Sequence, residues 1–493
     1  MLSRTRADVF FIGNSLKTNC LSLLLALTFY CFIVPGEFSV AHEYKITPES
    51  KLDPICKKAK AGDSIILADG IWKDVKFKFD RLPGTDADPI RILPQTTGGV
   101  TLTGKTDFRV SGTHVIISGL VFRDCHSVDD VFQLRSHEER PAENCRVTDC
   151  VFEETSDLQK SKEESRWLSI HGTNNRVDHC YFAGKKNKGT TLVVWVTQEP
   201  GRHQIDHNYF GARPELKENG GETIRVGTSD VSELVSATIV EDNFFHRCDG
   251  EAEVISNKSC ENIYRRNMFE QCSGALTLRH GHRCTVDGNA FLGQGGNGTG
   301  GVRIIGQGHV VTNNYFEGLR GSSARASISW MNGIPNSPLD EYAPVRDALV
   351  AHNTFVDCKV TMEFGVGASK KQSVAPADSK ILNNLFLPGK WPLFKFKVEP
   401  KDFQLEGNLL QSQSNDNRPV NFERRELKLR RADDGLMRPT RSSPLRVKVK
   451  SPVKTDIDGQ PRSRTTMAGC DQPKGSQITW PSRKNCGPTW VQK

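Results

Sequence analysis

A short repeated motif constrains the fold of this chain more than any other sequence feature. Each copy is a β-branched, strand-like segment, followed by Asn or Cys, one further residue and then Phe. Successive copies lie 22 to 39 residues apart, so a minimal unit of about 22 to 24 residues carries insertions of variable length. The clear copies end at Phe152, Phe182, Phe210, Phe245, Phe269, Phe291, Phe316, Phe355 and Phe386, and weaker copies end at Phe122 and Leu410.

Apolar and polar residues alternate inside each copy, which is typical of strands and not of helices. A strand-based repeat of this length predicts an all-β fold, the right-handed parallel β-helix, in which each coil stacks on the next at about 4.8 Å. The Phe residues would then form a ladder inside the stack, and the Asn side chains would bond from coil to coil. A β-propeller is the alternative, but it needs a blade signature that this chain lacks.

The first 41 residues are typical of a secretory signal peptide. Basic residues at positions 4, 6 and 17 precede an apolar run from Leu21 to Val34, and the small residues Ser39-Val40-Ala41 follow it. The run is shorter than the roughly 20 residues that a membrane span needs, which favours cleavage after Ala41 over an uncleaved membrane anchor. We therefore expect a secreted or periplasmic protein without stable membrane insertion.

The pattern divides the exported chain into two parts. Residues 42–470 are predicted to form the β-helix domain, with a helix over Leu52–Ala61 covering the open end of the stack. Residues 471–493 are predicted to be a C-terminal tail or cap. The chain becomes polar and basic from Glu423 to Gly435, which favours a solvated surface; a segment that tethers a polyanion is the alternative.

The cysteines indicate stacked thiols rather than a disulfide framework. Cys248 and Cys272 are 24 residues apart, and so are Cys260 and Cys284, so each pair would occupy equivalent positions in neighbouring coils. One disulfide between Cys470 and Cys486 is conceivable in the C-terminal cap. No CxxC pair occurs in the sequence, so a structural zinc site has no support.

The charge balance favours an anionic partner. Lys and Arg number 66 against 58 Asp and Glu, a formal net charge of +8. Removal of residues 1–41, which hold three basic and two acidic residues, leaves 8 − 1 = +7. This excess alone does not distinguish a polysaccharide from a nucleic acid.

One stretch of three successive repeats carries candidate chemistry. Glu251 and Glu253 are two residues apart in a strand, so both carboxylates would point to the same, outer face. Two adjacent carboxylates repel each other unless a cation or a proton holds them, and Asn219 in the preceding repeat supplies a third oxygen ligand, so calcium is the natural candidate. The alternative is a surface salt-bridge ladder with Lys258 and Arg279.

The motifs NGGETIR, EAEVISNKS, LTLRHG and TGGVRIIG in this stretch resemble polysaccharide lyase family 6, which contains alginate lyases and chondroitinase B. The resemblance covers about residues 45 to 410 and includes the β-helix fold. It implies that Asn219, Glu251 and Glu253 bind Ca²⁺. It also implies that Lys258 is the catalytic base and Arg279 the catalytic acid.

Two further residues in these motifs are candidates for substrate binding. Arg303 lies one repeat beyond Arg279 and is expected to bind a uronate; pairing with a neighbouring Glu is the alternative. His280 is expected to contact substrate, although a loop histidine with a satisfied hydrogen bond fits its sequence equally well.

The resemblance implies an anionic polysaccharide as the partner, with alginate first and no nucleic acid. Flanking segments, Lys185 to Trp195 and Ser329 to Tyr342 among them, are more similar to alginate lyases than to the chondroitinase. Three alternatives stay open: a dermatan sulfate lyase, a hydrolase of the polygalacturonase kind, and a non-catalytic polysaccharide-binding β-helix. The hydrolase needs clustered Asp residues, which this stretch lacks, so elimination is favoured.

Overall fold

The computed structural model describes residues 41–127, 129–156, 164–412, 422–462, 466–473 and 477–491. The predicted signal peptide lies outside these residues, apart from Ala41. Residues 41–493 form one compact unit. Within its described part, the strands form three long sheets, each of 14 strands, and one separate hairpin.

Sheet A, the first of the three, is parallel throughout, and each coil contributes one strand to it. Neighbouring strands pair in register without a shift along the whole sheet. Its strands are β1 (Glu43–Ile46), β2 (Ser64–Leu67), β5 (Ile90–Pro94), β8 (Val115–Ser118), β13 (Arg146–Thr148), β16 (Arg176–Asp178), β19 (Gln204–Asp206), β22 (Ile239–Glu241), β25 (Ile263–Arg265), β28 (Thr285–Asp287), β31 (Val310–Thr312), β34 (Leu349–Ala351), β37 (Lys380–Leu382) and β40 (Gln404–Glu406).

Sheet B follows sheet A in each coil after a sharp bend, and it holds the Phe of every repeat. Its strands are β3 (Gly70–Lys73), β6 (Val100–Lys105), β9 (Val121–His126), β14 (Val151–Glu153), β17 (Tyr181–Ala183), β20 (Tyr209–Phe210), β23 (Phe244–His246), β26 (Met268–Glu270), β29 (Ala290–Leu292), β32 (Tyr315–Glu317), β35 (Thr354–Val356), β38 (Leu385–Leu387), β41 (Leu409–Gln411) and β42 (Glu423–Arg425).

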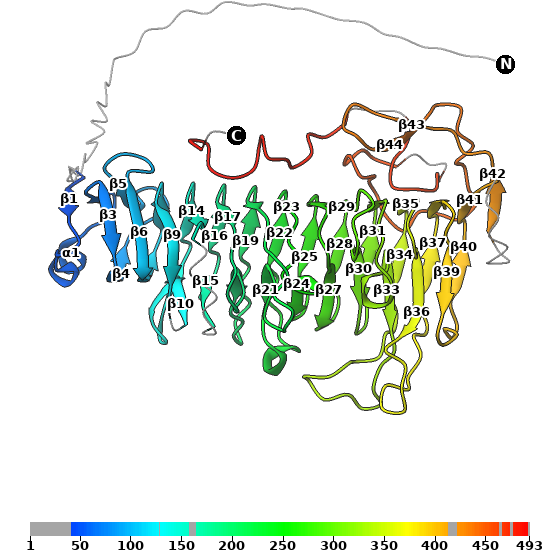
Figure 1. Ribbon diagram of the computed structural model, residues 1–493, viewed down its shortest axis with the longest axis horizontal. Coiled ribbons are helices and arrows are strands. Elements are labelled where there is room, and N and C mark those ends of the chain that lie inside the picture. The colour runs from blue at the N-terminus through cyan, green and yellow to red at the C-terminus, as the bar shows by residue number, and fades with distance from the viewer. Residues whose placement is uncertain are drawn as a thin grey trace, which may run out of the picture. The chain divides into compact units, whose positions relative to one another are not determined.

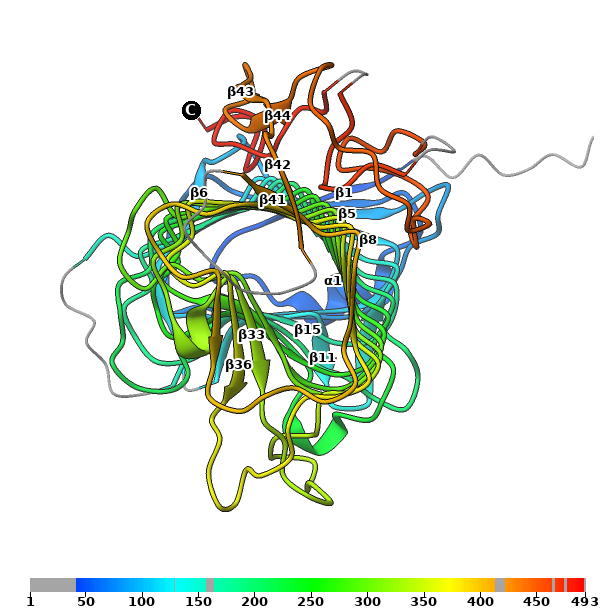
Figure 2. The same ribbon diagram turned by 90° about the vertical axis from the view of Figure 1, so that its right-hand side faces the viewer.

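Sheet C closes the coil and faces away from the other two (Figure 2). One antiparallel pair, β11 with β12, interrupts its parallel order. Its strands are β4 (Lys76–Pro83), β7 (Asp107–Thr113), β10 (Asp130–Gln133), β11 (Arg135–His137), β12 (Arg140–Glu143), β15 (Arg166–Ile170), β18 (Leu192–Val194), β21 (Ile224–Val226), β24 (Glu253–Lys258), β27 (Ala275–His280), β30 (Val302–Ile304), β33 (Ile328–Met331), β36 (Met362–Val366) and β39 (Phe394–Phe396).

The bend between sheets A and B explains the Asn of the repeat. The residue before each Asn adopts a left-handed conformation, as at Asp242 (φ 53°) and Arg266 (φ 53°), which turns the chain sharply. The Asn then points inward, and its carboxamide oxygen accepts a hydrogen bond from the backbone of the preceding coil, as from Asn243 N to Asn267 Oδ1 (3.1 Å). The predicted Asn ladder is confirmed; it runs through Asn208, Asn243, Asn267, Asn289, Asn314, Asn353, Asn384 and Asn408.

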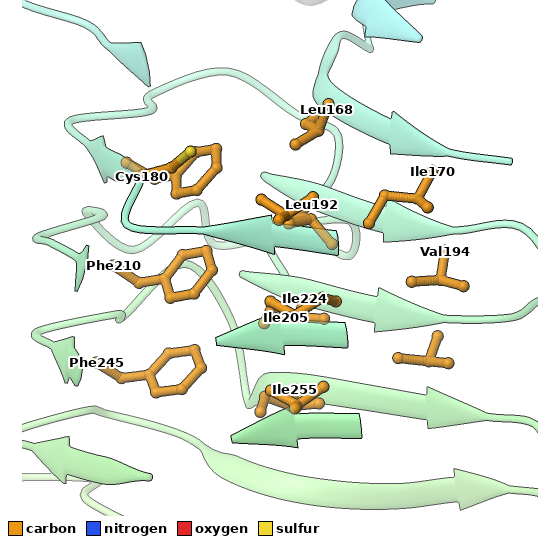
Figure 3. Packing of buried hydrophobic residues seen from close by; sticks show 14 of the residues in the cluster. Leu168, Ile170, Cys180, Leu192, Val194, Ile205, Phe210, Ile224, Phe245 and Ile255 are labelled. Carbon is orange, nitrogen blue, oxygen red and sulfur yellow. The ribbon is translucent and has the colours of Figure 1, made fainter. Parts of the chain in front are cut away.

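The interior of the stack is a set of apolar columns, one residue per coil. Phe rings of adjacent coils stack nearly parallel, for example Phe269 on Phe291 with ring centroids 4.6 Å apart and 3° between planes. In sheet C, Leu192 and Ile224 occupy one such column in register (Figure 3). The predicted parallel β-helix and its Phe ladder are therefore confirmed, because the repeat places the same apolar residue at the same point of each coil.

A short helix, α1 (Leu52–Lys58), covers the N-terminal end of the stack, as predicted. Leu52 and Cys56 are buried against the core. Two 3₁₀ turns, η1 (Ser229–Val231) and η2 (Ser323–Arg325), lie in the loops that follow sheet C and precede it, respectively. No helix in the described ranges is long and apolar enough to cross a membrane.

The chain after β42 runs back along the outer face of sheet B (Figure 1). It begins with the hairpin of β43 (Leu429–Arg431) and β44 (Met437–Pro439) and reaches the middle coils, where Trp490 Nε1 donates to the carbonyl of Asp149 (2.9 Å). We call residues 426–491 the covering segment. The predicted domain boundary at residue 470 lies within it.

All twelve cysteines of the described chain are buried, and no two of them form a disulfide. The prediction of stacked thiols is confirmed for one pair: Cys272 stacks on Cys248, and burial raises its pKa well above the ordinary value. It is wrong for the other pair, because Ile263 pairs with Thr285 and so places Cys284 opposite Asn262 instead of Cys260. The disulfide considered for Cys470 and Cys486 is not formed, since each packs separately against the outer face of sheet B.

Candidate active site

The basic predicted site residues, and Glu253, lie on the outer face of sheet C, on three neighbouring strands. Asn219 and Glu251 lie in the loops that precede β21 and β24, so the expectation that Glu251 and Glu253 share one strand is wrong. Inward-facing residues of β24, β27 and β30 fill the core, so the alternate residues face outward. Ser256, Thr277 and Arg303 lie directly opposite one another in register. Lys258 and His280 form the next opposed pair. The stacking of coils thus brings together residues that the sequence separates by more than 20 positions.

A β-bulge places Arg279. Asn257 pairs with Leu278 and Lys258 pairs with His280, so Arg279 is an extra residue in β27. A second irregularity occurs where β24 begins. Bulges re-aim side chains and are frequent beside active sites. Here the bulge directs the Arg279 guanidinium to the loop after β33, where Nη1 donates to the carbonyl of Glu341 (3.1 Å).

Arg279 is held from the loop side by an aromatic ring. Its guanidinium lies 4.1 Å from the ring centroid of Tyr342, a cation–π contact. His280 is buried beside it, with Nδ1 3.5 Å from Arg279 Nη1 and Nε2 3.2 Å from Ser229 Oγ. Burial, and then the charges of Arg279 and Lys258, lower the pKa of His280 to about 3. The imidazole is therefore neutral at ordinary pH and can form hydrogen bonds with hydroxyl groups.

Lys258, at the end of β24, is half-buried and has no hydrogen-bond or ion-pair partner in the described part of the chain. A lysine side chain without a partner is available to contact a ligand or to bind an anion. Several polar atoms of the same face also lack partners and are buried, Thr277 Oγ1 and Arg303 Nε among them. Such atoms are rare in folded proteins and need a partner such as water or a ligand.

The acidic half of the site lies where two loops approach each other. Glu251 accepts hydrogen bonds from the backbone of Gly220 (3.0 Å) and Gly221 (3.4 Å), the two residues that follow Asn219. A Cβ on Gly221 would collide with the carbonyl oxygen of Gly250, so glycine is required at this crossing. The structure thus brings the exposed Asn219 into the same loop pair as Glu251.

A buried arginine builds this loop pair. Arg213 is 3% exposed, and its guanidinium donates to the carbonyls of Glu222 (2.7 Å) and Gly189 (2.9 Å). A weaker bond reaches the carbonyl of Gly220 (3.4 Å). Because one guanidinium has five donors, a single side chain can fix the whole turn that carries Asn219.

The electrostatics of the acidic half fit a bound cation. Burial, and then repulsion from Glu222 and Glu253, raise the pKa of Glu251 to about 7. Glu222 is buried, and its Oε2 has no hydrogen-bond partner. A divalent cation would reduce the repulsion between the carboxylates and give the unpaired oxygen of Glu222 a partner. No group of three or more His, Cys, Asp and Glu side chains in the described ranges is arranged to hold a metal ion by itself.

Glu253 and Arg303 form an ion pair. Arg303 Nη2 lies 2.7 Å from Glu253 Oε1, and both side chains are largely buried. The second oxygen of Glu253 accepts a hydrogen bond from Ser256 Oγ (2.5 Å). The pairing of Arg303 that the sequence left as an alternative is therefore present, and the pair joins the acidic half of the site to the basic half.

The same face continues toward the N-terminus as a polar groove. A cavity of about 390 Å³ lies over β10 and β15, with Arg109, Arg135, Arg166 and Trp195 in its lining. Trp195 lies between two arginines, with Arg166 5.3 Å and Arg225 5.6 Å from its ring centroid. The outer face of sheet C thus offers room for an extended ligand along several coils.

Sequence reasoning missed three residues of the site. Tyr342 lay inside a segment read only for its similarity to alginate lyases, and no periodicity connects it with Arg279. Arg213 and Glu222 act through backbone contacts and burial, which a single sequence does not reveal. The glycines of NGGETIR were the one available signal, since adjacent glycines mark a close backbone approach.

The fold and this face define a class of protein: a parallel β-helix with one outer face whose charged and polar groups can bind a ligand. The chain belongs to the chondroitinase B family, whose sequence profile matches residues 46–428. No curated protein matches the chain.

Solved structures confirm the resemblance to polysaccharide lyase family 6. The PL6 family alginate lyase AlyGC is 36% identical, with a TM-score of 0.80; the match covers 92% of this chain and 59% of that one, so this chain spans about three fifths of AlyGC. A mannuronic acid specific family 6 lyase from human gut microbiota is 31% identical, with a TM-score of 0.64, over 76% of this chain and 87% of that one. A PL6 lyase from Pseudopedobacter saltans, 22% identical over 91% of this chain and 100% of that one, shares the fold with a TM-score of 0.69.

Proposed function

We propose that this chain is a secreted polysaccharide lyase that cleaves alginate by calcium-assisted β-elimination. One observation carries the proposal: an unpartnered lysine, an aromatic-held arginine and a repelling carboxylate cluster share one outer face of a β-helix. The two family 6 lyases above 30% identity, one titled an alginate lyase and the other mannuronic acid specific, support the substrate.

The reaction assigns one task to each basic residue. Lys258 accepts the proton from C5 of the uronate, and the electron pair left on C5 forms a C4–C5 double bond. The C4–O bond breaks, and the departing oxygen is protonated on the side of the sugar that faces Arg279. A guanidinium is a very weak acid, so Arg279 supplies positive charge to this oxygen and the proton comes through a water that Arg279 or His280 holds.

Asn219, Glu251 and Glu253 are the residues that would hold Ca²⁺. When bound, the ion neutralises the uronate carboxylate and so makes the C5 proton more acidic. Gly220 and Gly221 orient Glu251 through their N–H groups, and Arg303 orients Glu253 through the ion pair. We also expect Arg303 and the neutral His280 to bind the uronate and its hydroxyl groups.

A dermatan sulfate lyase is the second candidate, because the family profile carries the name of chondroitinase B. The test is to incubate purified protein with alginate, dermatan sulfate and pectate and to follow the ultraviolet absorbance of the unsaturated uronate. We expect product from alginate, and loss of product after exhaustive chelation with recovery on addition of Ca²⁺. Product from dermatan sulfate alone would favour the second candidate, and no product from any uronate polymer would refute the lyase.

Secretion has a direct test as well. N-terminal sequencing of the exported protein should begin at His42. A protein that retains Met1 in the membrane fraction would contradict the predicted cleavage after Ala41.

A further inference from the structure

The net positive charge of the exported chain is concentrated in one segment. Residues 422–455 hold eleven Lys and Arg against four Asp and Glu, a difference of +7. The whole chain after residue 41 also carries +7, so the remainder, including the candidate active site, is balanced. This segment comprises β42, the hairpin and the strand-like stretch that follows it.

Part of this charge is used inside the fold. Arg438 is buried and pairs with Asp434 (2.5 Å) and Asp458 (2.8 Å). Arg431 pairs with Glu317 of β32 (2.6 Å). Arg431 thus attaches the covering segment to the solenoid, whereas Arg438 joins parts of the covering segment to one another; neither is available to a ligand.

Three of the remaining cations form a row. Leu445 is buried and Val447 half-buried against the outer face of sheet B, where Leu385 and Leu409 lie. Arg446, Lys448 and Lys450 alternate with these residues and are exposed. None of the three has an ion-pair partner among the described residues.

The backbone under this row is fixed to the last coil. Arg425 of β42 pairs with Glu423 (2.6 Å) and donates to the carbonyls of Pro444 (2.7 Å) and Arg446 (2.6 Å). A cavity of about 870 Å³ opens beside the row, with Arg441 among its lining residues. A fixed cationic row next to a hollow is a surface prepared for a polymer rather than for a small ion.

The row and the candidate active site lie on different sides of the solenoid. Figure 2 shows the hairpin and the chain after it outside β41 and β42, whereas β33 and β36 of sheet C lie on the opposite side of the coil. The row therefore cannot contact a sugar unit that Lys258 is cleaving, and any polymer that it binds is held at a second place.

We propose that Arg446, Lys448 and Lys450 form a second, non-catalytic binding surface for an anionic polysaccharide, which keeps the protein on the polymer between cleavage events. The identity of the polymer as alginate rests on the proposed function. Residues 441–450 contain no aromatic side chain for stacking on nucleic-acid bases, and the apolar residues beneath the row pack against the outer face of sheet B and so offer no lipid-facing surface. Three neighbouring exposed cations without ion-pair partners suit a polymer that carries many negative charges.

The test uses a triple variant, R446Q/K448Q/K450Q, and a matched control, K57Q/K58Q/K60Q, which removes the same charge from exposed lysines near α1. Each is made in a Lys258→Ala background, so that the polymer stays intact, and affinity for alginate is measured by electrophoresis through gels with and without the polymer. We expect the triple variant to bind about tenfold more weakly and the control to bind within about twofold of the parent. With Lys258 present, both should cleave a short oligosaccharide at the unmodified rate.

Three results would separate this proposal from its alternatives. Unchanged alginate affinity in the triple variant overturns the proposal. Tighter binding of the parent to duplex DNA or to vesicles of anionic lipid than to alginate, lost in the triple variant, replaces the polysaccharide by that partner. If no uronate polymer is cleaved but the triple variant still loses alginate binding, the proposed function fails and the binding surface stands.

Discussion

The outer faces of sheets B and C belong to the same coils, but the first is covered by other parts of the chain and the second carries the candidate active site. Sheet B presents apolar side chains outward, and the covering segment buries them. Its outward residues over the middle coils are Tyr209, Phe244, Met268, Ala290 and Tyr315. Sheet C presents polar and charged side chains outward, several of them with buried atoms that have no partner. The core is common to both sheets, so the outer residues alone decide whether a face serves stability or binding.

This difference explains why the two faces should respond differently to substitution. A residue on the outer face of sheet C supports no core packing. Its loss should therefore change the chemistry and leave the fold intact. A residue that covers sheet B contributes to stability by burying apolar surface. Its loss should therefore lower the stability and leave the chemistry unchanged. The predictions below test this division.

The largest effect is expected at Lys258. Lys258→Ala should lower turnover on alginate by at least about 10²-fold and up to about 10⁴-fold, because general base catalysis contributes a factor of that size. Unsaturated-uronate formation measures turnover, and circular dichroism checks the fold. Lys395→Ala is the matched control, since Lys395 is an exposed lysine of the same sheet. Near-normal turnover in folded Lys258→Ala would assign the base elsewhere.

On sheet B the largest effect is expected at Trp480, which is 7% exposed and packs on the apolar outer face. Trp480→Ala should lower the free energy of unfolding by about 3 to 5 kcal/mol. Turnover of the remaining folded protein should be unchanged. Thermal unfolding measures the loss, and Ile71→Ala is the control, because Ile71 also lies in sheet B but is 76% exposed. Equal losses in the two variants would show that the covering segment does not seal this face.

The parts of the structure that the sequence predicted correctly are those that repeat. The Phe and Asn ladders follow from spacing and period, because every coil must satisfy the same contacts with its neighbours. Lys258 and Arg279 were placed on neighbouring strands by the same spacing. The bulge that re-aims Arg279, and the ring of Tyr342 that holds it, occur once and leave no periodic signal.

The covering segment shows the limit of pattern reading in another way. The segment after Leu410 was interpreted by its charge, as a solvated surface and then a cap at the end of the stack. Its buried residues, such as Leu436 and Trp480, are too widely spaced to predict a strand or a helix. What they pack against is set by the outward residues of sheet B, which lie more than 100 positions earlier in the chain.

An internal substitution should affect both faces together. Asn267 donates to the carbonyl of Val240 (2.9 Å) and to Asn289 Oδ1 (3.0 Å), and accepts from Asn243. Asn267→Ala leaves these buried groups without partners and should cost about 1 to 3 kcal/mol of stability. Thermal unfolding with a probe on each face should show one common transition. Separate transitions for the two faces would contradict a shared core.

The smallest effect sharpens the comparison on sheet C itself, where charge rather than packing limits stability. The pKa of Glu251 is raised from 4.5 to about 7, chiefly by burial. Between these values the folded protein binds more protons than the unfolded chain, so the stability of the metal-free protein falls as the pH rises through this window. Glu251→Gln removes the penalty, and above pH 7 the metal-free variant should be more stable than the parent by on the order of 1 kcal/mol, with no difference in acid.

Calcium should reverse this order. The parent protein should gain thermal stability when Ca²⁺ is added, because the ion binds only the folded state, and Glu251→Gln should gain little. Glu218→Gln, a change at an exposed neighbour, is the control and should behave like the parent in both media. Equal stabilisation of the parent and Glu251→Gln by Ca²⁺ would remove Glu251 from the ligand set. The raised pKa would then reflect its carboxylate neighbours alone, with Arg303 and Lys258 left to neutralise the uronate.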